Sequence, residues 1–201
     1  MQSIRAFISI EIPQEIKEKI SLIQEQFKVV ETPVSWVRLD SIHLTLKFLG
    51  NIMEEQIPDI KKCIDTAVNG ISPFNVNVKG GGVFPNLNYP RVIWLGLEDR
   101  TDSLFKLQKG IDSCLDKIGF ESEERGFTPH LTLGRVKSLK GKSHLIRTIH
   151  IYKDIEVGEI NVDKIKLMRS QLNPTGAIYT VLEEVRLTAV ESGQCSVVSD
   201  E

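Results

Sequence analysis

The chain has 201 residues, of which 41% are hydrophobic and 26% are charged, and its formal net charge is −2. This length suits one large domain or two small lobes that share a core, and the composition is ordinary for a globular protein. Proteins that bind long nucleic-acid tracts usually carry a strong basic excess, because each phosphate that they neutralise adds affinity. The charge therefore argues against a protein that coats a strand. If RNA is the ligand, we expect recognition of an end.

Apolar runs in the chain are short, and a run such as Val92 to Leu95 cannot span a bilayer. The N-terminus lacks the long apolar run and cleavage site of a signal peptide, so we expect a cytoplasmic protein with no membrane partner. Cys63, Cys114 and Cys195 are odd in number and widely spaced. This pattern predicts idle or buried thiols, with neither a disulfide framework nor a zinc site.

In chain order, the first predicted elements are a strand and a helix, and both occur twice. The run R-A-F-I-S-I-E-I-P opens at Arg5, and R-V-I-W-L-G-L-E-D opens 86 residues later at Arg91. Both runs are rich in β-branched and aromatic residues, which favours strands. Apolar residues at helical spacing then predict helices over residues 14–27 and 101–118.

The next predicted elements repeat in the same order. H-L-T-L-K-F-L-G opens at His43, and H-L-T-L-G-R-V-K opens 87 residues later at His130. A predicted helix follows each motif, over residues 54–68 and 143–152, and then a strand-like run that opens at residue 74 and again at residue 160. Five matches in one order indicate an internal duplication.

A last predicted strand, Ala177 to Leu187, completes the fold, and residues 188–201 are predicted to form a flexible tail. We expect a single domain over residues 1–187, of the α+β class. It should be bilobal, with two pseudo-twofold-related lobes whose antiparallel sheets line a central cleft and whose helices pack outside. Gly80-Gly81-Gly82, at the junction of the repeats, is predicted to form a tight turn and lacks the spacing of a P-loop.

The H-L-T-L motif has a polar and an apolar face if it is a strand, because successive side chains point to opposite sides. The leucines and Phe48 then share one face, which we assign to the core. His43 and Thr45 share the other face, and His130 and Thr132 do the same in the second copy. These four polar side chains are therefore predicted to face the cleft.

This set of residues suits acid–base chemistry at a phosphate. Two imidazoles can share one proton near neutral pH, one as base and the other as acid. Two hydroxyls can donate hydrogen bonds to an anion without adding charge. A zinc site would need a further ligand at metal-binding spacing, and neither motif has one. The other two histidines, His144 and His150, lie in no such motif and are predicted to be solvated.

At these motifs the sequence resembles the two-histidine (2H) phosphoesterase superfamily, whose signature is a pair of H-x-[T/S]-x motifs. Within it, the chain is similar to the bacterial and archaeal RNA 2′,3′-cyclic phosphodiesterases, formerly called 2′-5′ RNA ligases. The resemblance extends from residue 4 to about residue 187 and includes W-V-R-L-D-S-I-H-L-T-L-K-F-L-G, F-T-P-H-L-T-L-G-R and S-Q-L-N-P-T-G-A-I-Y. It implies a bilobal fold with a V-shaped cleft. It also implies hydrolysis of a cyclic phosphate to a 2′-phosphate, without a metal or other cofactor.

The resemblance also implies roles for the motif residues. His43 would protonate the departing 3′ oxygen as proton donor, and His130 would activate water as proton acceptor. Thr45 and Thr132 would hold the non-bridging oxygens. The near-symmetry of the two motifs leaves the division of labour between the histidines open.

Two further residues are candidates for substrate binding. Arg135 follows the second motif and either pairs with phosphate or is solvated. Residues 170–179 are predicted to form a loop over the cleft, with Pro174 and Gly176 shaping a turn. Tyr179, at the end of this loop, either contacts the base or packs.

Three functions remain in view. The first is hydrolysis of RNA ends or small 2′,3′-cyclic nucleotides. The second is ligation, in which a 5′-hydroxyl replaces water and gives a 2′-5′ linkage. The third is a non-catalytic module that binds RNA ends, although intact His and Thr in both motifs argue against it. For each, we expect a monomer without an obligate protein partner.

Overall fold

The computed structural model describes residues 3–29, 32–122, 126–173 and 176–188. Its helices and short 3-10 turns are α1 (Gln14–Lys28), η1 (Leu39–Ser41), η2 (Glu54–Gln56), α2 (Ile57–Val68), α3 (Ser103–Asp116) and α4 (Lys142–Ile151). The strands are β1 (Ser3–Glu11), β2 (Val34–Trp36), β3 (His43–Met53), β4 (Phe74–Phe84), β5 (Val92–Glu98), β6 (His130–Val136), β7 (Glu156–Val162), β8 (Lys164–Asn173) and β9 (Gly176–Arg186).

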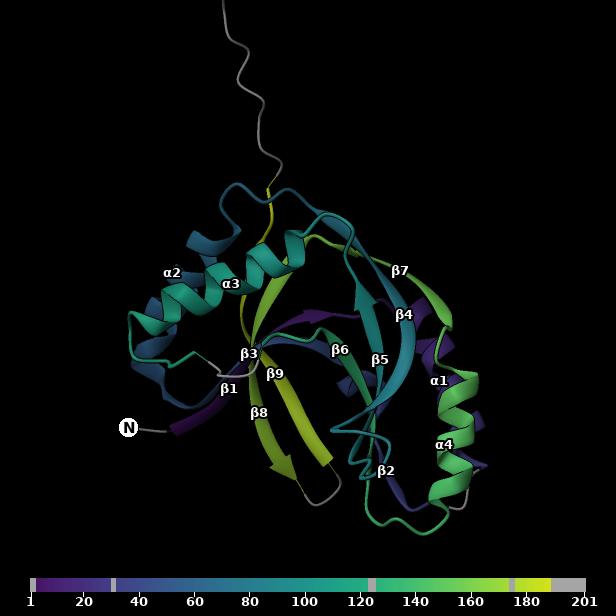
Figure 1. The fold of residues 1–201 in the computed structure, drawn as a ribbon. Helices are drawn as coiled ribbons and strands as arrows, with labels where there is room; N and C mark the ends of the chain where they lie inside the picture. The colour runs from purple at the N-terminus through teal and green to yellow at the C-terminus, as the bar shows by residue number, and fades with distance from the viewer. Residues whose placement is uncertain (1–2, 30–31, 123–125, 174–175, 189–201) are drawn as a thin grey trace, which may run out of the picture.

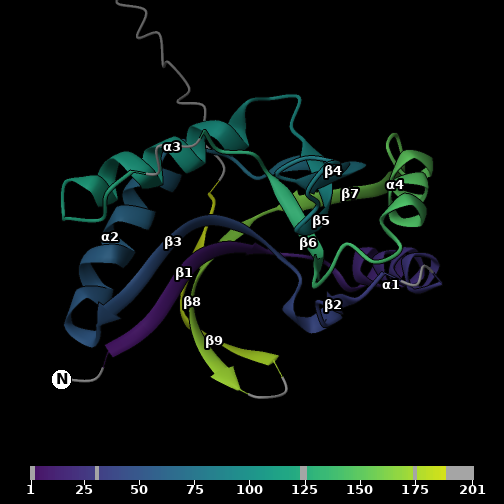
Figure 2. The ribbon, with the colours of Figure 1, turned by 60° about the horizontal axis from the view of Figure 1, so that its bottom comes forward.

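The strands form one antiparallel sheet in the order β7-β4-β5-β6-β3-β1-β8-β9, with β2 paired to β6. The centre of this order is the β3–β6 pair, where Leu44 lies opposite Leu131. Outward from the centre, β1 and β5 occupy matching places, and so do β8 and β4. The sheet curls strongly, and its strands β3, β1, β8 and β9 follow one curve in Figure 2. The strands of both halves thus meet at the two H-L-T-L motifs.

Helices cover the two halves of the sheet in pairs (Figure 1). α2 and α3 pack together, with α2 against β9 and α3 against β3, while α1 contacts β7 and α4 contacts β4. In the chain α1 follows β1, but it covers the half of the sheet that contains β7. Likewise α3 follows β5, but it covers the half that contains β3. The apolar stripe of α1 is buried as its spacing predicts, with Ile16, Ile20, Ile23 and Phe27 in the core.

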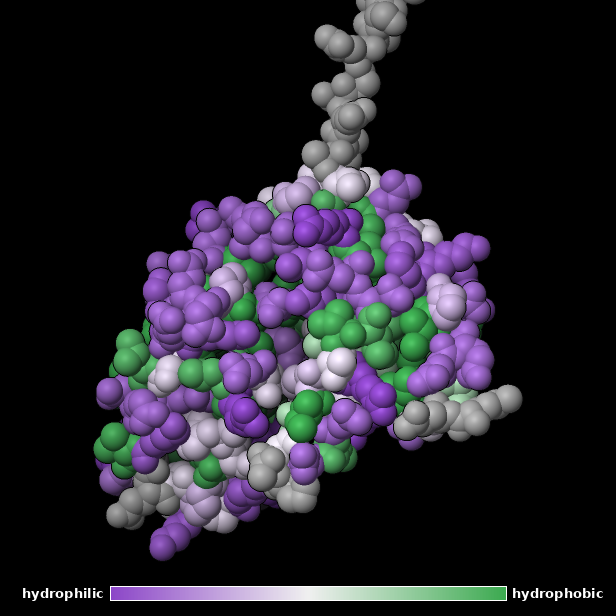
Figure 3. Space-filling model, turned by 180° about the vertical axis from the view of Figure 1, so that it is seen from behind, coloured by the Kyte–Doolittle hydropathy of each residue, from purple (hydrophilic) through white to green (hydrophobic). Residues whose placement is uncertain are grey.

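The α+β class and its two related halves are confirmed, and the sheets of the two halves join into one. Alternation along the strands explains the core, because Leu44, Leu131 and Leu133 are almost completely buried. The opposite view of the molecule shows a mostly hydrophilic surface with smaller hydrophobic patches (Figure 3). Among the described residues, no helix is long and apolar enough to cross a membrane.

The predicted tight turn at the junction of the repeats is part of a strand in the structure. Gly80-Gly81-Gly82 lies inside β4, where the pairing with β5 slips between Val78 and Gly81. Gly80 has a φ of +76°, and a Cβ at Gly82 would lie 2.4 Å from the Trp94 ring, so this irregular strand needs glycine. The prediction of a tight turn was therefore wrong.

The predicted loop over residues 170–179 is instead a β-hairpin formed by β8 and β9, with Ser170 paired to Tyr179. Pairing between the two strands satisfies the backbone hydrogen-bonding groups of both. The polar sequence S-Q-L-N-P-T-G does not reveal this pairing. Pro174 lies outside the described residues. So does the predicted tail, residues 188–201, except Thr188.

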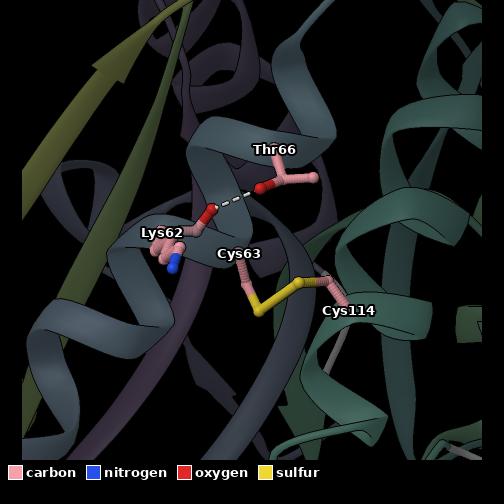
Figure 4. Close-up of a disulfide and its surroundings, with 4 residues drawn as sticks. All are labelled: Lys62, Cys63, Thr66 and Cys114. Carbon is pink, nitrogen blue, oxygen red and sulfur yellow. Dashed lines mark hydrogen bonds between the residues drawn. A yellow bond between two sulfur atoms is a disulfide. The ribbon is translucent and has the colours of Figure 1, made fainter.

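A disulfide links Cys63 on α2 to Cys114 on α3 (Figure 4). The two Cα atoms are 5.4 Å apart, and 51 positions separate the cysteines in the chain. The prediction of unpaired thiols was therefore wrong for these two residues. Spacing alone cannot reveal the pair, because it depends on how α2 and α3 pack against each other. Cys195 lies outside the described residues.

Candidate active site

The two motif histidines are held in the same way. Nδ1 of His43 lies 2.8 Å from the carbonyl oxygen of Ser41, the last residue of η1. Nδ1 of His130 likewise lies 2.8 Å from the carbonyl oxygen of Thr128. A carbonyl oxygen only accepts, so both bonds favour the proton on Nδ1. Each ring therefore presents Nε2 as the nitrogen that can accept a proton from a substrate or donate one to it.

Pairing at the centre of the sheet brings the motifs together. Because Leu44 lies opposite Leu131 in an antiparallel pair, His43 comes next to Thr132, and Thr45 comes next to His130. The leucines point into the core, so all four polar side chains point to the other face of the sheet. These four side chains are half-buried, in agreement with a position at the wall of a cleft.

His43 has the drier surroundings. Its ring stacks on Phe7 at a centroid distance of 4.6 Å and packs against the Tyr179 ring in a T-shaped arrangement at a centroid distance of 5.2 Å. The pKa of His43 is lowered to about 4, and burial is the largest cause. The charges of His130 and Lys17 also lower it, whereas the hydrogen bond to Ser41 raises it. The neutral imidazole is therefore the form that this site favours in the absence of an anion.

His130 contacts a different aromatic residue, Phe84, in a T-shaped arrangement with a centroid distance of 4.9 Å.

Burial raises the pKa of Tyr179, although the charges of Arg135 and Arg5 lower it in part. Tyr179 thus keeps its phenolic proton near neutral pH and remains a hydrogen-bond donor.

Two adjoining cavities open at the histidines. The larger, of about 790 Å³, is lined by His43, Arg135 and Tyr179, three of the predicted site residues. The smaller, of about 460 Å³, is lined by His130 and Thr45. Thr132 lines neither of them. Five of the six predicted site residues therefore line one or the other of these cavities.

Phe48 also lines both cavities, and its side chain is 58% exposed. The prediction that it lies in the core was therefore wrong. Ser9 pairs with Thr45 and Ile8 pairs with Lys47, so β3 has one extra residue at this point. This β-bulge reverses the alternation and turns Phe48 toward the site.

The same bulge turns Lys47 toward the interior, where its side chain is 3% exposed. Its Nζ forms an ion pair with Asp112 of α3 and donates to the carbonyl oxygen of Glu121. Burial raises the pKa of Asp112, but hydrogen bonds from Lys47 and Ser122 outweigh it, so the pKa lies below its ordinary value. This charged pair ties β3 to α3 beside the smaller cavity.

Sequence reasoning missed Arg5, Arg38 and Phe7, which line the larger cavity. Alternation offered a signal for two of them, since Arg5 and Phe7 lie on the face of β1 opposite to the buried Ile4 and Ile8. Which face of β1 borders the site depends on its pairing with β3, which the sequence does not show. In the described part of the chain, no group of three or more His, Cys, Asp or Glu side chains is placed to hold a metal ion.

Comparison with known proteins identifies the family. A sequence model of the LigT-like phosphoesterases matches the chain twice, over residues 10–94 and 95–179. The chain belongs to this family. The two successive matches agree with the repeat in the sequence, and the resemblance to the 2H phosphoesterases is confirmed.

Relatives of this LigT-like phosphoesterase support the same assignment. It is 42% identical to the RNA 2′,3′-cyclic phosphodiesterase of Methanocaldococcus jannaschii over 90% of this chain and 99% of that protein. Its fold matches the crystal structure of TT0787 of Thermus thermophilus with a TM-score of 0.78, at 27% identity, covering 91% of this chain and 97% of that one. The fold also matches E. coli LigT, solved in complex with 3′-AMP, with a TM-score of 0.72 at 24% identity, covering 94% and 100% of the two chains.

Proposed function

We propose that this protein is an RNA 2′,3′-cyclic phosphodiesterase that opens a terminal cyclic phosphate to a 2′-phosphate. The observation that carries the proposal is the matched pair of histidines, each fixed through Nδ1 by the carbonyl two residues earlier and each with Nε2 available. The name of the 42% identical M. jannaschii relative supports the substrate class. The E. coli LigT complex with 3′-AMP agrees with a nucleotide ligand in this fold.

The proposed reaction is an in-line displacement at phosphorus. Nε2 of His130 accepts a proton from water as the water oxygen bonds to phosphorus. The bond from phosphorus to O3′ breaks on the opposite side, and His43 donates its Nε2 proton to O3′. The product carries a 2′-phosphate and a 3′-hydroxyl. No step requires a metal or another cofactor.

The low pKa of His43 bears on this assignment, because a proton donor must first hold the proton. A bound cyclic phosphate places a negative charge beside the imidazole, which favours the protonated ring and raises its pKa. His43 then acquires its proton together with the substrate. As the bond from phosphorus to O3′ breaks, negative charge develops on O3′, and the dry surroundings of His43 favour transfer of its proton to that oxygen.

The remaining candidates would bind the substrate. Thr45 and Thr132 would donate hydrogen bonds to the non-bridging oxygens, and Arg135 would pair with the phosphate. Tyr179, which packs on His43, would contact the terminal nucleotide. We expect the enzyme to act as a monomer on RNA ends or small 2′,3′-cyclic nucleotides.

The test is incubation of the protein with a short RNA that has a 2′,3′-cyclic end, followed by analysis of the end group. We expect a 2′-phosphate, with and without excess EDTA. His43→Ala and His130→Ala should each lower turnover by about 10² to 10⁴-fold. His144→Ala, which removes an exposed histidine on α4, is the matched control and should retain turnover. A longer strand would indicate ligation, and retention of unchanged RNA would indicate a binding module; either as the sole result would contradict the proposal.

The division between acid and base can be tested with a cyclic substrate whose 3′ bridging oxygen is replaced by sulfur. A thiolate leaves without protonation, so the variant that lacks the acid should regain much of its rate on this substrate. We expect this recovery for His43→Ala and not for His130→Ala. The opposite result would exchange the two roles.

A further inference from the structure

The larger cavity is basic, although the whole chain has a net charge of −2. Arg5, Arg38 and Arg135 line it, and no Asp or Glu does so among the described residues. A cleft lined by charges of one sign concentrates its field on a ligand of opposite sign. A single cyclic phosphate carries one negative charge, so three guanidinium groups exceed what it requires.

Two of these arginines belong to the inner part of the cavity. The charges of Arg135 and Arg5 both act on the phenol of Tyr179, whose ring lies 5.2 Å from the ring of His43. They are therefore close to the position that we assign to the reacting phosphate. Arg38 follows β2 and precedes η1 in the chain, and its charge is not among those that act on Tyr179.

Arg38 reaches across to the β8–β9 hairpin. Its Cδ lies 3.9 Å from the position that a Cβ at Gly176 would occupy, at the start of β9. Its side chain is 63% exposed, and its ion pair with Asp40 spans 3.9 Å between two exposed groups. Such a pair contributes little, so it would not prevent the guanidinium from binding a phosphate with two hydrogen bonds.

We propose that Arg38 binds the phosphodiester on the 5′ side of the terminal nucleotide, so that the preferred substrate is an oligonucleotide end and not a cyclic mononucleotide. This inference rests on the proposed function, because it takes the cyclic phosphate to lie at His43. The cavity volume of about 790 Å³ is in the upper part of the roughly 300–1,000 Å³ found for ligand sites. Exposed Leu172 and Phe48 in the same lining offer apolar surface to a second nucleoside.

The experiment compares kcat/KM for a 2′,3′-cyclic mononucleotide with kcat/KM for a dinucleotide that has the same terminal base. For the wild type we expect the dinucleotide to be about tenfold better, as one charge-assisted contact provides. Arg38→Gln should bring the ratio close to one. Arg38→Lys should restore part of it, because lysine keeps the charge and loses the planar fork. Arg147→Gln, the same charge change on the outer helix α4, is the matched control and should keep the wild-type ratio.

A dinucleotide whose internal linkage is a methylphosphonate separates charge from base contacts, since it keeps both bases and loses the negative charge. The wild type should treat it like the mononucleotide. If it remains about tenfold better, the second base provides the preference. If Arg38→Gln retains the ratio, a group other than Arg38 provides it. Either result means that the role of Arg38 is wrong. Equal kcat/KM for mononucleotide and dinucleotide in the wild type would also overturn the role. Failure to hydrolyse either substrate is a different result, which would overturn the proposed function itself.

Discussion

Acidification from pH 7 to pH 5 should destabilise the fold through His43. This imidazole titrates at about 4 in the folded protein and near its ordinary 6.5 in the unfolded chain. Between these values the unfolded chain binds a proton that the folded protein does not. The free energy of unfolding therefore falls as the pH drops from 6.5 toward 4. With about 1.4 kcal/mol for each pKa unit, the loss between pH 7 and pH 5 is about 2 kcal/mol.

The assay is urea unfolding of the wild type and of His43→Asn at both pH values. Asparagine does not titrate, so the variant should lose about 2 kcal/mol less than the wild type. His144→Asn, which removes an exposed histidine on α4, serves as the matched control. A direct check follows the His43 ring by NMR, and its titration midpoint should rise when inorganic phosphate is added. An equal acid-induced loss in wild type and His43→Asn would refute the reasoning.

Three further outcomes follow from other parts of the structure. Lys47→Met should lower the free energy of unfolding by about 3 kcal/mol, because it removes the ion-pair partner of the Asp112 carboxylate. Urea unfolding measures this loss, with Lys61→Met, which changes an exposed lysine on α2, as the control. Equal losses in the two variants would contradict the prediction. Cys63→Ser should lower stability by about 2–4 kcal/mol, since the disulfide closes a loop across 51 positions, and unchanged thermal unfolding would oppose this. The plot of kcat/KM against pH should be bell-shaped, with limbs that belong to the pair of histidines and not to either residue alone. The profile should persist in excess EDTA. Activity that EDTA removes and added divalent metal restores would count against two-histidine catalysis.

Periodicity predicted most of the elements, because it depends on local sequence. The apolar spacing of α1 and the alternation of H-L-T-L each identify a buried face without knowledge of neighbouring elements. The repeat then predicted two related halves, with a histidine contributed by each.

What the sequence did not reveal depends on contacts between distant segments. The extra residue at Leu46 is a bulge only with respect to β1, so alternation carried past it put Phe48 on the wrong face. The disulfide depends on the packing of α2 against α3, and the hairpin depends on the pairing of β8 with β9. Arg38 lines the larger cavity together with Gly176 of that hairpin, and the sequence does not show that these two residues lie near each other.

The repeat supplies two histidines in the same motif, whereas the proposed reaction gives them different roles. The backbone preserves the equivalence, because His43 and His130 make the same carbonyl bond at 2.8 Å from the first position of their strands. The difference comes from side chains outside the motifs. Phe7 stacks on the ring of His43, and the ring of Tyr179 packs against it in a T-shaped arrangement. These contacts remove water from the imidazole and disfavour its charged form. Neither aromatic residue is part of H-L-T-L. Residues of β1 and β9, and not the motifs themselves, therefore account for the distinct environment of His43.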